Sequence, residues 1–96
     1  MTYLDEIADI FALLGEQSRL RIVLACLEQP LCVGDIAVQT GLSPSLTSHH
    51  LRLLKAARLV KARRAGKHIY YEAADDHVRC ILTDMIDHVQ EGATPA

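Results

Sequence analysis

Aromatic residues are scarce in this sequence. It contains no Trp, one Phe and three Tyr in 96 residues, so Leu, Ile, Val and Ala must build the core, a composition that suits helices packed on helices. A chain of this length forms one domain with a modest core, and dimerisation would bury its surplus apolar surface.

Long hydrophobic runs are also absent. No stretch approaches the roughly 20 apolar residues that span a bilayer, and the N-terminus lacks the basic region and apolar stretch of a signal peptide. We therefore expect a cytoplasmic protein. Three cysteines at irregular spacing, Cys26, Cys32 and Cys80, argue against a disulfide framework. We interpret Cys26 and Cys80 as small buried hydrophobic side chains.

The net charge of −2 is unusual for a DNA-binding protein, but the charges are segregated along the chain. Residues 1–42 carry two basic and six acidic groups, and residues 72–96 carry one basic and six acidic groups. The segment 43–71 carries seven basic groups and no acidic group. Such a basic block is the footprint expected for contact with phosphates, whatever the total charge.

The spacing of apolar residues predicts five helices and one hairpin. The predicted helices cover 3–14, 19–27, 33–39, 43–57 and 76–91. The segments 59–63 and 67–72 read as two strands, joined by a turn at 64–66 in which Gly66 can adopt a positive φ.

This order of elements is that of a winged helix-turn-helix, a mainly α fold with a small β-hairpin. We predict a single domain over 1–92 in which the N- and C-terminal helices form a homodimer, and a disordered tail at 93–96. Within the domain we expect a reading helix at about 43–57, a wing at 59–72 and a helix for dimerisation and metal binding at 76–91.

The helix at 33–39 and the reading helix are joined at helix-turn-helix spacing, in which the second helix enters the major groove. Short hydroxyl and imidazole side chains near the start of the reading helix can approach base edges and phosphates. Basic side chains follow on its flank and at the tip of the wing. The candidate contacts to double-stranded operator DNA are Ser43, Ser45, Thr47, Ser48, His49, His50, Arg52, Lys55, Arg63, Arg64 and Lys67. The alternative is a solvated basic face without a ligand.

His49 and His50 cannot face the same surface, because consecutive helical residues are about 100° apart. We interpret one as a DNA contact and the other as a packing residue, and neither as a metal ligand.

The most specific chemistry lies at the two ends of the last helix. Asp75, His77, His88 and Glu91 supply two imidazoles and two carboxylates, a set suited to zinc or cobalt. His77 and His88 are 11 residues apart, so they share a helix face but are separated by roughly 16 Å along the axis. Zinc–nitrogen bonds are only about 2 Å long. One helix therefore cannot complete the site, although His88 and Glu91, at i and i+3, can share an ion.

If two copies of this helix pack antiparallel about a two-fold axis, the start of one helix lies next to the end of the other, and the separated ligands can meet. Each dimer then gains two sites, each built from Asp75 and His77 of one subunit and His88 and Glu91 of the other. Asp75 must lie at or before the helix cap, because on a regular helix it would point away from His77. An apolar stripe supplies the packing surface: Val78, Ile81, Leu82, Met85, Ile86 and Val89. The alternative is that the four polar residues are ordinary surface on an acidic helix.

Several stretches of the chain resemble the ArsR/SmtB family of metal-responsive repressors, and the resemblance covers nearly all of it. They are LCVGDIA at 31–37, GLSPSLTSHHL at 41–51, GKHIYY at 66–71, and DDH at 75–77 with DHVQE at 87–91. The last pair is similar to the C-terminal-helix site of the zinc-sensing branch, with all four ligand positions filled. The resemblance implies a cytoplasmic homodimer that represses an operon and releases its operator on binding Zn(II) at two sites per dimer. Co(II) and Ni(II) are the other candidate effectors.

The resemblance also bears on three finer points. It implies a hydrogen bond from the second ring nitrogen of His88 to backbone near Arg58, an allosteric link between the metal site and the reading helix. Relatives that sense thiophilic ions often carry Cys-Val-Cys on the third helix; Gly34 replaces the second cysteine here, which leaves Cys32 with Asp35 as a weak alternative metal site. A four-ligand site of oxygen and nitrogen suits tetrahedral zinc better than octahedral nickel.

Other functions remain as alternatives. A repressor of the same fold could respond to thiol oxidation or to another ligand, with the metal site structural or vestigial. A zinc hydrolase would need an open coordination position and a general base, but the sequence has no His-Glu-x-x-His pattern or other catalytic constellation. We therefore do not expect an enzyme.

Overall fold

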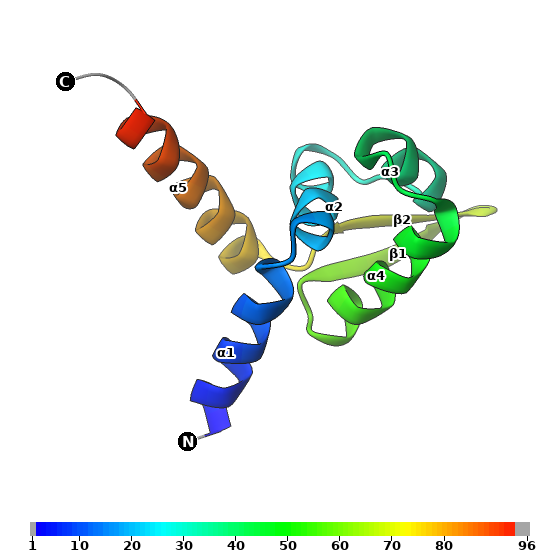
Figure 1. Ribbon diagram of the computed structural model, residues 1–96. Helices are drawn as coiled ribbons and strands as arrows, with labels where there is room; N and C mark the ends of the chain where they lie inside the picture. The colour runs from blue at the N-terminus through cyan, green and yellow to red at the C-terminus, as the bar shows by residue number, and fades with distance from the viewer. Residues whose placement is uncertain (1, 94–96) are drawn as a thin grey trace.

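The computed structural model describes residues 2–93 and contains the predicted five helices and hairpin (Figure 1). The elements are α1 (Thr2–Leu14), α2 (Gln17–Glu28), α3 (Val33–Thr40), α4 (Pro44–Ala56), β1 (Val60–Ala65), β2 (His68–Ala73) and α5 (Asp76–Ala93). Residues 94–96 of the tail predicted to be disordered lie outside the described residues.

The core lies between α2, α3, α4 and the hairpin. Its fully buried side chains come from all of these elements and are mostly aliphatic: Ile22, Val23, Cys26, Ile36, Leu51, Leu54 and Val60. Helices α1 and α5 extend away from this body (Figure 1), and α1 has no buried residue. The chain therefore consists of a compact reading unit with two projecting helices.

Helix α2 begins two residues before its predicted start. Glu16 is its N-cap, and the two carboxylate oxygens accept hydrogen bonds from the backbone N–H groups of Ser18 (3.1 Å) and Arg19 (3.0 Å). Glu is not among the preferred N-cap residues, so the sequence pattern alone did not reveal this start. The Arg19 Nε also donates to the carbonyl of Leu13 at 2.8 Å, which joins α1 to α2.

The hairpin forms with its strands displaced by one or two residues from the prediction. The antiparallel register pairs Ala65 with His68, so the turn contains Gly66, at φ 63°, and Lys67. Tyr71 also exchanges two backbone hydrogen bonds with Leu31, at 3.0 and 2.8 Å. This bridge, which the sequence pattern did not predict, fixes the base of the wing to the loop after α2.

Helix α5 is held at its start and projects at its end. Asp75 caps the helix, because its Oδ1 accepts a hydrogen bond from the N–H of Val78 at 2.9 Å. This confirms the prediction that Asp75 lies at the helix cap. The Arg79 guanidinium donates to the carbonyl of Leu27 in α2. The helix runs two residues beyond its predicted end at 91, since one glycine in a helix costs only about 1 kcal/mol relative to alanine, and Ala93, predicted to begin the disordered tail, is its last residue. Among residues 2–93, no helix is both long and apolar enough to cross a membrane.

Candidate DNA-binding surface and metal site

The helix-turn-helix is built by capping at both sides of its turn. Helix α3 ends at Gly41, whose N–H bonds the carbonyl of Ala37 at 2.9 Å and whose left-handed φ of 74° then turns the chain away from the helix. Helix α4 then begins after Ser43, whose Oγ accepts from the N–H of Leu46 at 3.1 Å, with Pro44 at the first helical position. These caps set the entry of α4, the reading helix.

The reading helix divides its candidate DNA contacts between two faces. On the outer face, Ser48 is half-buried and the remaining candidates are exposed: Ser43, Ser45, His49, Arg52 and Lys55. The inner face includes Thr47, whose side chain is completely buried and whose Oγ1 donates to the carbonyl of Ser43 at 2.8 Å. His50 is only 8% exposed. Burial thus excludes Thr47 and His50 from the candidate DNA contacts. Of the two adjacent histidines, His49 is the one exposed to solvent.

His50 is a polar group held within the reading unit. Among the described residues, its buried Nδ1 has no hydrogen-bond partner. Burial lowers the pKa of His50; the Glu16 carboxylate opposes this shift, while the positive charges of Arg19 and His49 add to it. The folded protein therefore disfavours the imidazolium form.

The lowered pKa predicts that stability falls as His50 is protonated. In the unfolded chain His50 takes up a proton near its ordinary pKa of 6.5, whereas the folded chain resists it, so the free energy of unfolding should decrease as the pH drops below this value. Chemical denaturation between pH 7.5 and 5 should show this decrease in the wild type and a smaller one in His50→Gln. The same substitution at His68, which is exposed on the wing and is not among the groups that shift the pKa of His50, is the matched control. An identical pH dependence in wild type and His50→Gln would contradict the prediction.

The basic side chains of the wing fall into two groups. At the tip, Arg64 donates its Nε to the carbonyl of Gly66 at 3.3 Å, and Lys67 lies in the turn. Nearer the base, Arg63 and Lys61 both form ion pairs with Glu72. Arg63, Arg64 and Lys67 are all exposed, as a contact with DNA requires.

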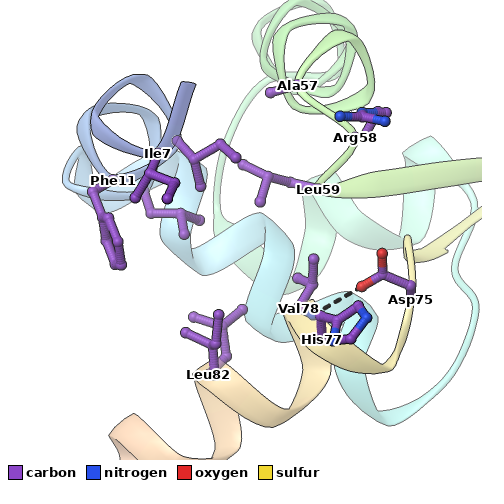
Figure 2. Close-up of a pocket in the computed structure, with 12 residues that line it drawn as sticks. Ile7, Phe11, Ala57, Arg58, Leu59, Asp75, His77, Val78 and Leu82 are labelled. Atoms are coloured by element: carbon purple, nitrogen blue, oxygen red, sulfur yellow. Dashed lines mark hydrogen bonds between the residues drawn. The ribbon is translucent and has the colours of Figure 1, made fainter. Parts of the chain in front are cut away.

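Two of the four predicted metal ligands lie together in the chain. Asp75 and His77 stand at one edge of an apolar cavity of about 410 Å³ between α1, the start of α5 and the segment after α4 (Figure 2). Capping engages Oδ1 of Asp75 but not its Oδ2. This edge therefore presents a carboxylate oxygen and an imidazole side by side.

The other two predicted ligands, His88 and Glu91, are exposed in the last turns of α5, far along the projecting helix. Within residues 2–93 of one chain, no group of three or more His, Cys, Asp or Glu side chains is close enough to hold a metal ion. One chain therefore places the ligands in two separate pairs, and any four-ligand site requires a second subunit.

Apolar side chains are exposed on both of the helices that border the cavity. Large hydrophobic side chains are exposed on both projecting helices: Tyr3, Leu4, Ile7 and Phe11 on α1, and Ile81, Met85, Ile86 and Val89 on α5. Exposed apolar side chains gathered on two projecting helices in this way are typical of an interaction site. Of the predicted stripe, Val78 and Leu82 are covered within the chain, and the other four residues remain open.

Arg58 closes the reading helix next to the Asp75–His77 edge. It is the only non-glycine residue with positive φ (59°) among residues 2–93. Its N–H bonds the carbonyl of Lys55 at 3.0 Å and the N–H of Leu59 bonds that of Leu54 at 2.9 Å, which is the Schellman pattern that usually places Gly at this position. The exposed Arg58 side chain lines the cavity and lies 3.9 Å from Glu6. The end of the reading helix is thus directly beside two candidate ligands.

The cysteines are spread over three elements. Cys26 is buried in the core, and burial raises the pKa of its thiol to about 11, which makes it a poor nucleophile. The expectation that Cys80 is buried is wrong, because it is exposed on the projecting part of α5. Cys32 caps α3, and its Sγ donates to Oδ2 of Asp35 at 3.3 Å. This contact supplies only two candidate ligands.

Sequence comparisons match the chain to known regulators. Residues 16–62 match the family model for bacterial regulatory proteins of the arsR family. A transcriptional repressor SmtB homolog of Synechocystis is 44% identical over 87 residues, covering 91% of this chain and 66% of the relative. A cadmium resistance transcriptional regulatory protein CadC homolog of Staphylococcus aureus is 37% identical over 90 residues, covering 93% and 74%. The chain thus spans about two-thirds to three-quarters of the length of these relatives, both of which are named as transcriptional regulators.

Structural comparisons identify the same architecture. The homodimeric winged helix-turn-helix DNA-binding domain of a possible ArsR-family regulator from Mycobacterium bovis superposes with a TM-score of 0.89 at 29% identity, covering 96% of this chain and 85% of that one. NolR from Sinorhizobium fredii gives a TM-score of 0.80 at 31% identity, covering 90% and 86%. These similarities confirm the predicted winged helix-turn-helix.

Proposed function

Because this chain belongs to the ArsR family of bacterial regulatory proteins, we propose that it is a homodimeric transcriptional repressor that Zn(II) releases from its operator. The observation that carries the metal part is the division of four ligands into two pairs at opposite ends of one projecting helix. Neither pair alone supplies the four ligands of a zinc site. Antiparallel association of two α5 helices would bring the Asp75–His77 pair of one subunit to the His88–Glu91 pair of the other.

The exposed apolar faces of α1 and α5 support the dimer. They flank the cavity that bears Asp75 and His77, so a second copy that covers them would bring the end of its own α5 toward this edge. A structural relative with a TM-score of 0.89 is homodimeric. In the dimer, Asp75 and His77 of one subunit would hold the ion with His88 and Glu91 of the other, giving two sites.

The donor chemistry supports Zn(II) as the effector. Two imidazole nitrogens and two carboxylate groups form a borderline ligand set that fits four-coordinate zinc, and Co(II) as a close substitute. Ni(II), which often prefers more ligands, is the less suitable alternative. Cys32 with Asp35 offers two donors within one turn of α3 and is the weaker candidate site.

We assign DNA contact to the accessible residues of the reading helix and the wing. In a dimer, two reading helices would enter successive major grooves of a two-fold operator. The proposed contacts are Ser43, Ser45, Ser48, His49, Arg52, Lys55, Arg63, Arg64 and Lys67.

Arg58 is the proposed connection between metal and DNA. It ends the reading helix and lines the same cavity as Asp75 and His77, where His88 of the other subunit would arrive in the dimer. A hydrogen bond from the free ring nitrogen of that histidine to backbone near Arg58 would make the orientation of α4 depend on metal occupancy. By linkage, DNA must then weaken metal binding by the same factor as metal weakens DNA binding.

The decisive measurement is operator affinity with and without Zn(II), for wild type and for His88→Ala. We expect Zn(II) to weaken binding by the wild type and to leave His88→Ala bound, since removal of one imidazole eliminates a ligand at each site. Cys32→Ala is the matched control and should respond to zinc as the wild type does. If Cys32→Ala alone loses the response, the α3 cysteine is the sensor; if zinc has no effect on the wild type, the metal-release proposal fails while the fold stands.

A further inference from the structure

The base of the wing carries an ion cluster centred on one acidic residue. Glu72 is the first acidic residue after Asp35 in the chain, and the strand register places it directly opposite Lys61. Its Oε1 lies 3.4 Å from Nζ of Lys61, and its Oε2 lies 3.7 Å from Nη2 of Arg63. Each carboxylate oxygen therefore holds one cation of β1.

The acidic member of the cluster is the most buried of the three. The Glu72 side chain is 21% exposed, against 57% for Lys61 and 62% for Arg63. Lys61 and Arg63 are two residues apart and therefore lie on the same face of β1, so both are within reach of the Glu72 carboxylate. Because exposed ion pairs contribute little to stability, the main effect of this cluster is on the surface charge of the wing.

The cations at the tip are placed differently. Arg64 bonds a neutral carbonyl oxygen, that of Gly66, which orients its guanidinium, and within residues 2–93 no carboxylate pairs with it. Lys67 lies beside it in the turn. The wing extends toward the end of the molecule at which α3 and the start of α4 lie (Figure 1). The positive charge of the wing is thus uncompensated at the tip and partly offset toward the base.

We propose that Glu72 determines which part of the wing binds the phosphate backbone of duplex DNA. It offsets part of the charge of Lys61 and Arg63 and repels phosphates that approach the base, which weakens the contact made by Arg63 and shifts backbone contact toward Arg64 and Lys67 at the tip. The residue thereby sets the register of the wing on the duplex and limits sequence-independent affinity. This inference rests on the DNA-binding part of the proposed function, and not on its metal part.

The test measures the salt dependence of binding by the full-length protein, without metal, to a duplex of mixed sequence. The plot of log K against log salt concentration has a negative slope, and each phosphate contact by Lys or Arg makes it steeper by roughly 0.9. Glu72→Gln, which keeps the side-chain shape, should steepen the slope by about one to two and raise affinity at low salt roughly tenfold. Glu28→Gln, the same charge change at the end of α2, should not steepen it.

A triple variant identifies the cations that respond. Adding Lys61→Ala and Arg63→Ala to Glu72→Gln should return the slope to the wild-type value. An unchanged slope for Glu72→Gln, or weaker binding at an unchanged slope, would overturn the inference and show that Glu72 only shapes the wing. Wild-type protein that fails to bind the duplex would overturn the DNA-binding function itself, and this inference with it.

Discussion

Mixed dimers of His77→Ala and His88→Ala are expected to recover the zinc-dependent release of operator DNA that each variant lacks alone. Each homodimer has a damaged ligand pair at both sites. In the mixed dimer, one site loses both histidines, whereas the other combines the intact Asp75–His77 pair of one subunit with the intact His88–Glu91 pair of the other. One functional site per dimer is therefore restored only if the sites are shared between subunits.

The expected recovery is large enough to measure by fluorescence anisotropy of a labelled operator. Allosteric coupling energies are typically about 1–3 kcal/mol, which corresponds to a change in operator affinity of roughly 5- to 150-fold. Subunits should be mixed under conditions that allow exchange, and operator affinity measured with and without Zn(II) for each variant and for the mixture.

A second mixture provides the matched control. His88→Ala and Glu91→Ala alter the same ligand pair, so their mixed dimer has one damaged ligand at each site and should not respond to zinc. Recovery in this control, or no recovery in the His77 and His88 mixture, would rule out a site that joins the two ends of α5 across the dimer.

The sequence predicted the order of elements well because the signals are local. The reading helix follows from Ser43-Pro44 and the apolar period after it, and its predicted span of 43–57 differs from the observed α4 only by the two capping residues. The spacing of His77 and His88 likewise placed them near opposite ends of one helix without any knowledge of packing, and α5 contains both as one continuous helix. The position of Asp75 before α5 followed from the same reasoning.

The features that the sequence did not reveal depend on contacts between distant segments or on unusual caps. Glu16 caps α2 although Glu is a poor N-cap by preference. Thr47 belongs to a hydroxyl-rich stretch that looks like a DNA contact, yet its place on the inner face buries it completely. The pairing of Glu72 with Lys61 depends on strand register, and the Leu31–Tyr71 bridge joins residues 40 positions apart. Local periodicity contains no information on any of these contacts.

Ile81→Glu is expected to separate the dimer and, with it, to abolish tight operator binding. The Ile81 side chain is 50% exposed on α5 and lines the cavity between the projecting helices, so a charged residue there costs a single folded chain little. In the dimer each copy would bury an unpaired carboxylate, a penalty of about 3 kcal/mol or more. Because a two-fold operator requires two reading helices, its affinity should fall by roughly 100-fold or more.

Analytical ultracentrifugation and operator titration together test this prediction. Thr83→Glu places the same charge on the opposite side of α5, where the Thr83 hydroxyl bonds only carbonyls of its own helix. This control should remain dimeric and bind the operator. Circular dichroism should show equal helical content in both variants, because α1 and α5 project from a core that neither substitution enters. A dimeric Ile81→Glu protein with wild-type operator affinity would place the dimer interface elsewhere, and the shared metal site with its two ligand pairs would then lose its structural basis.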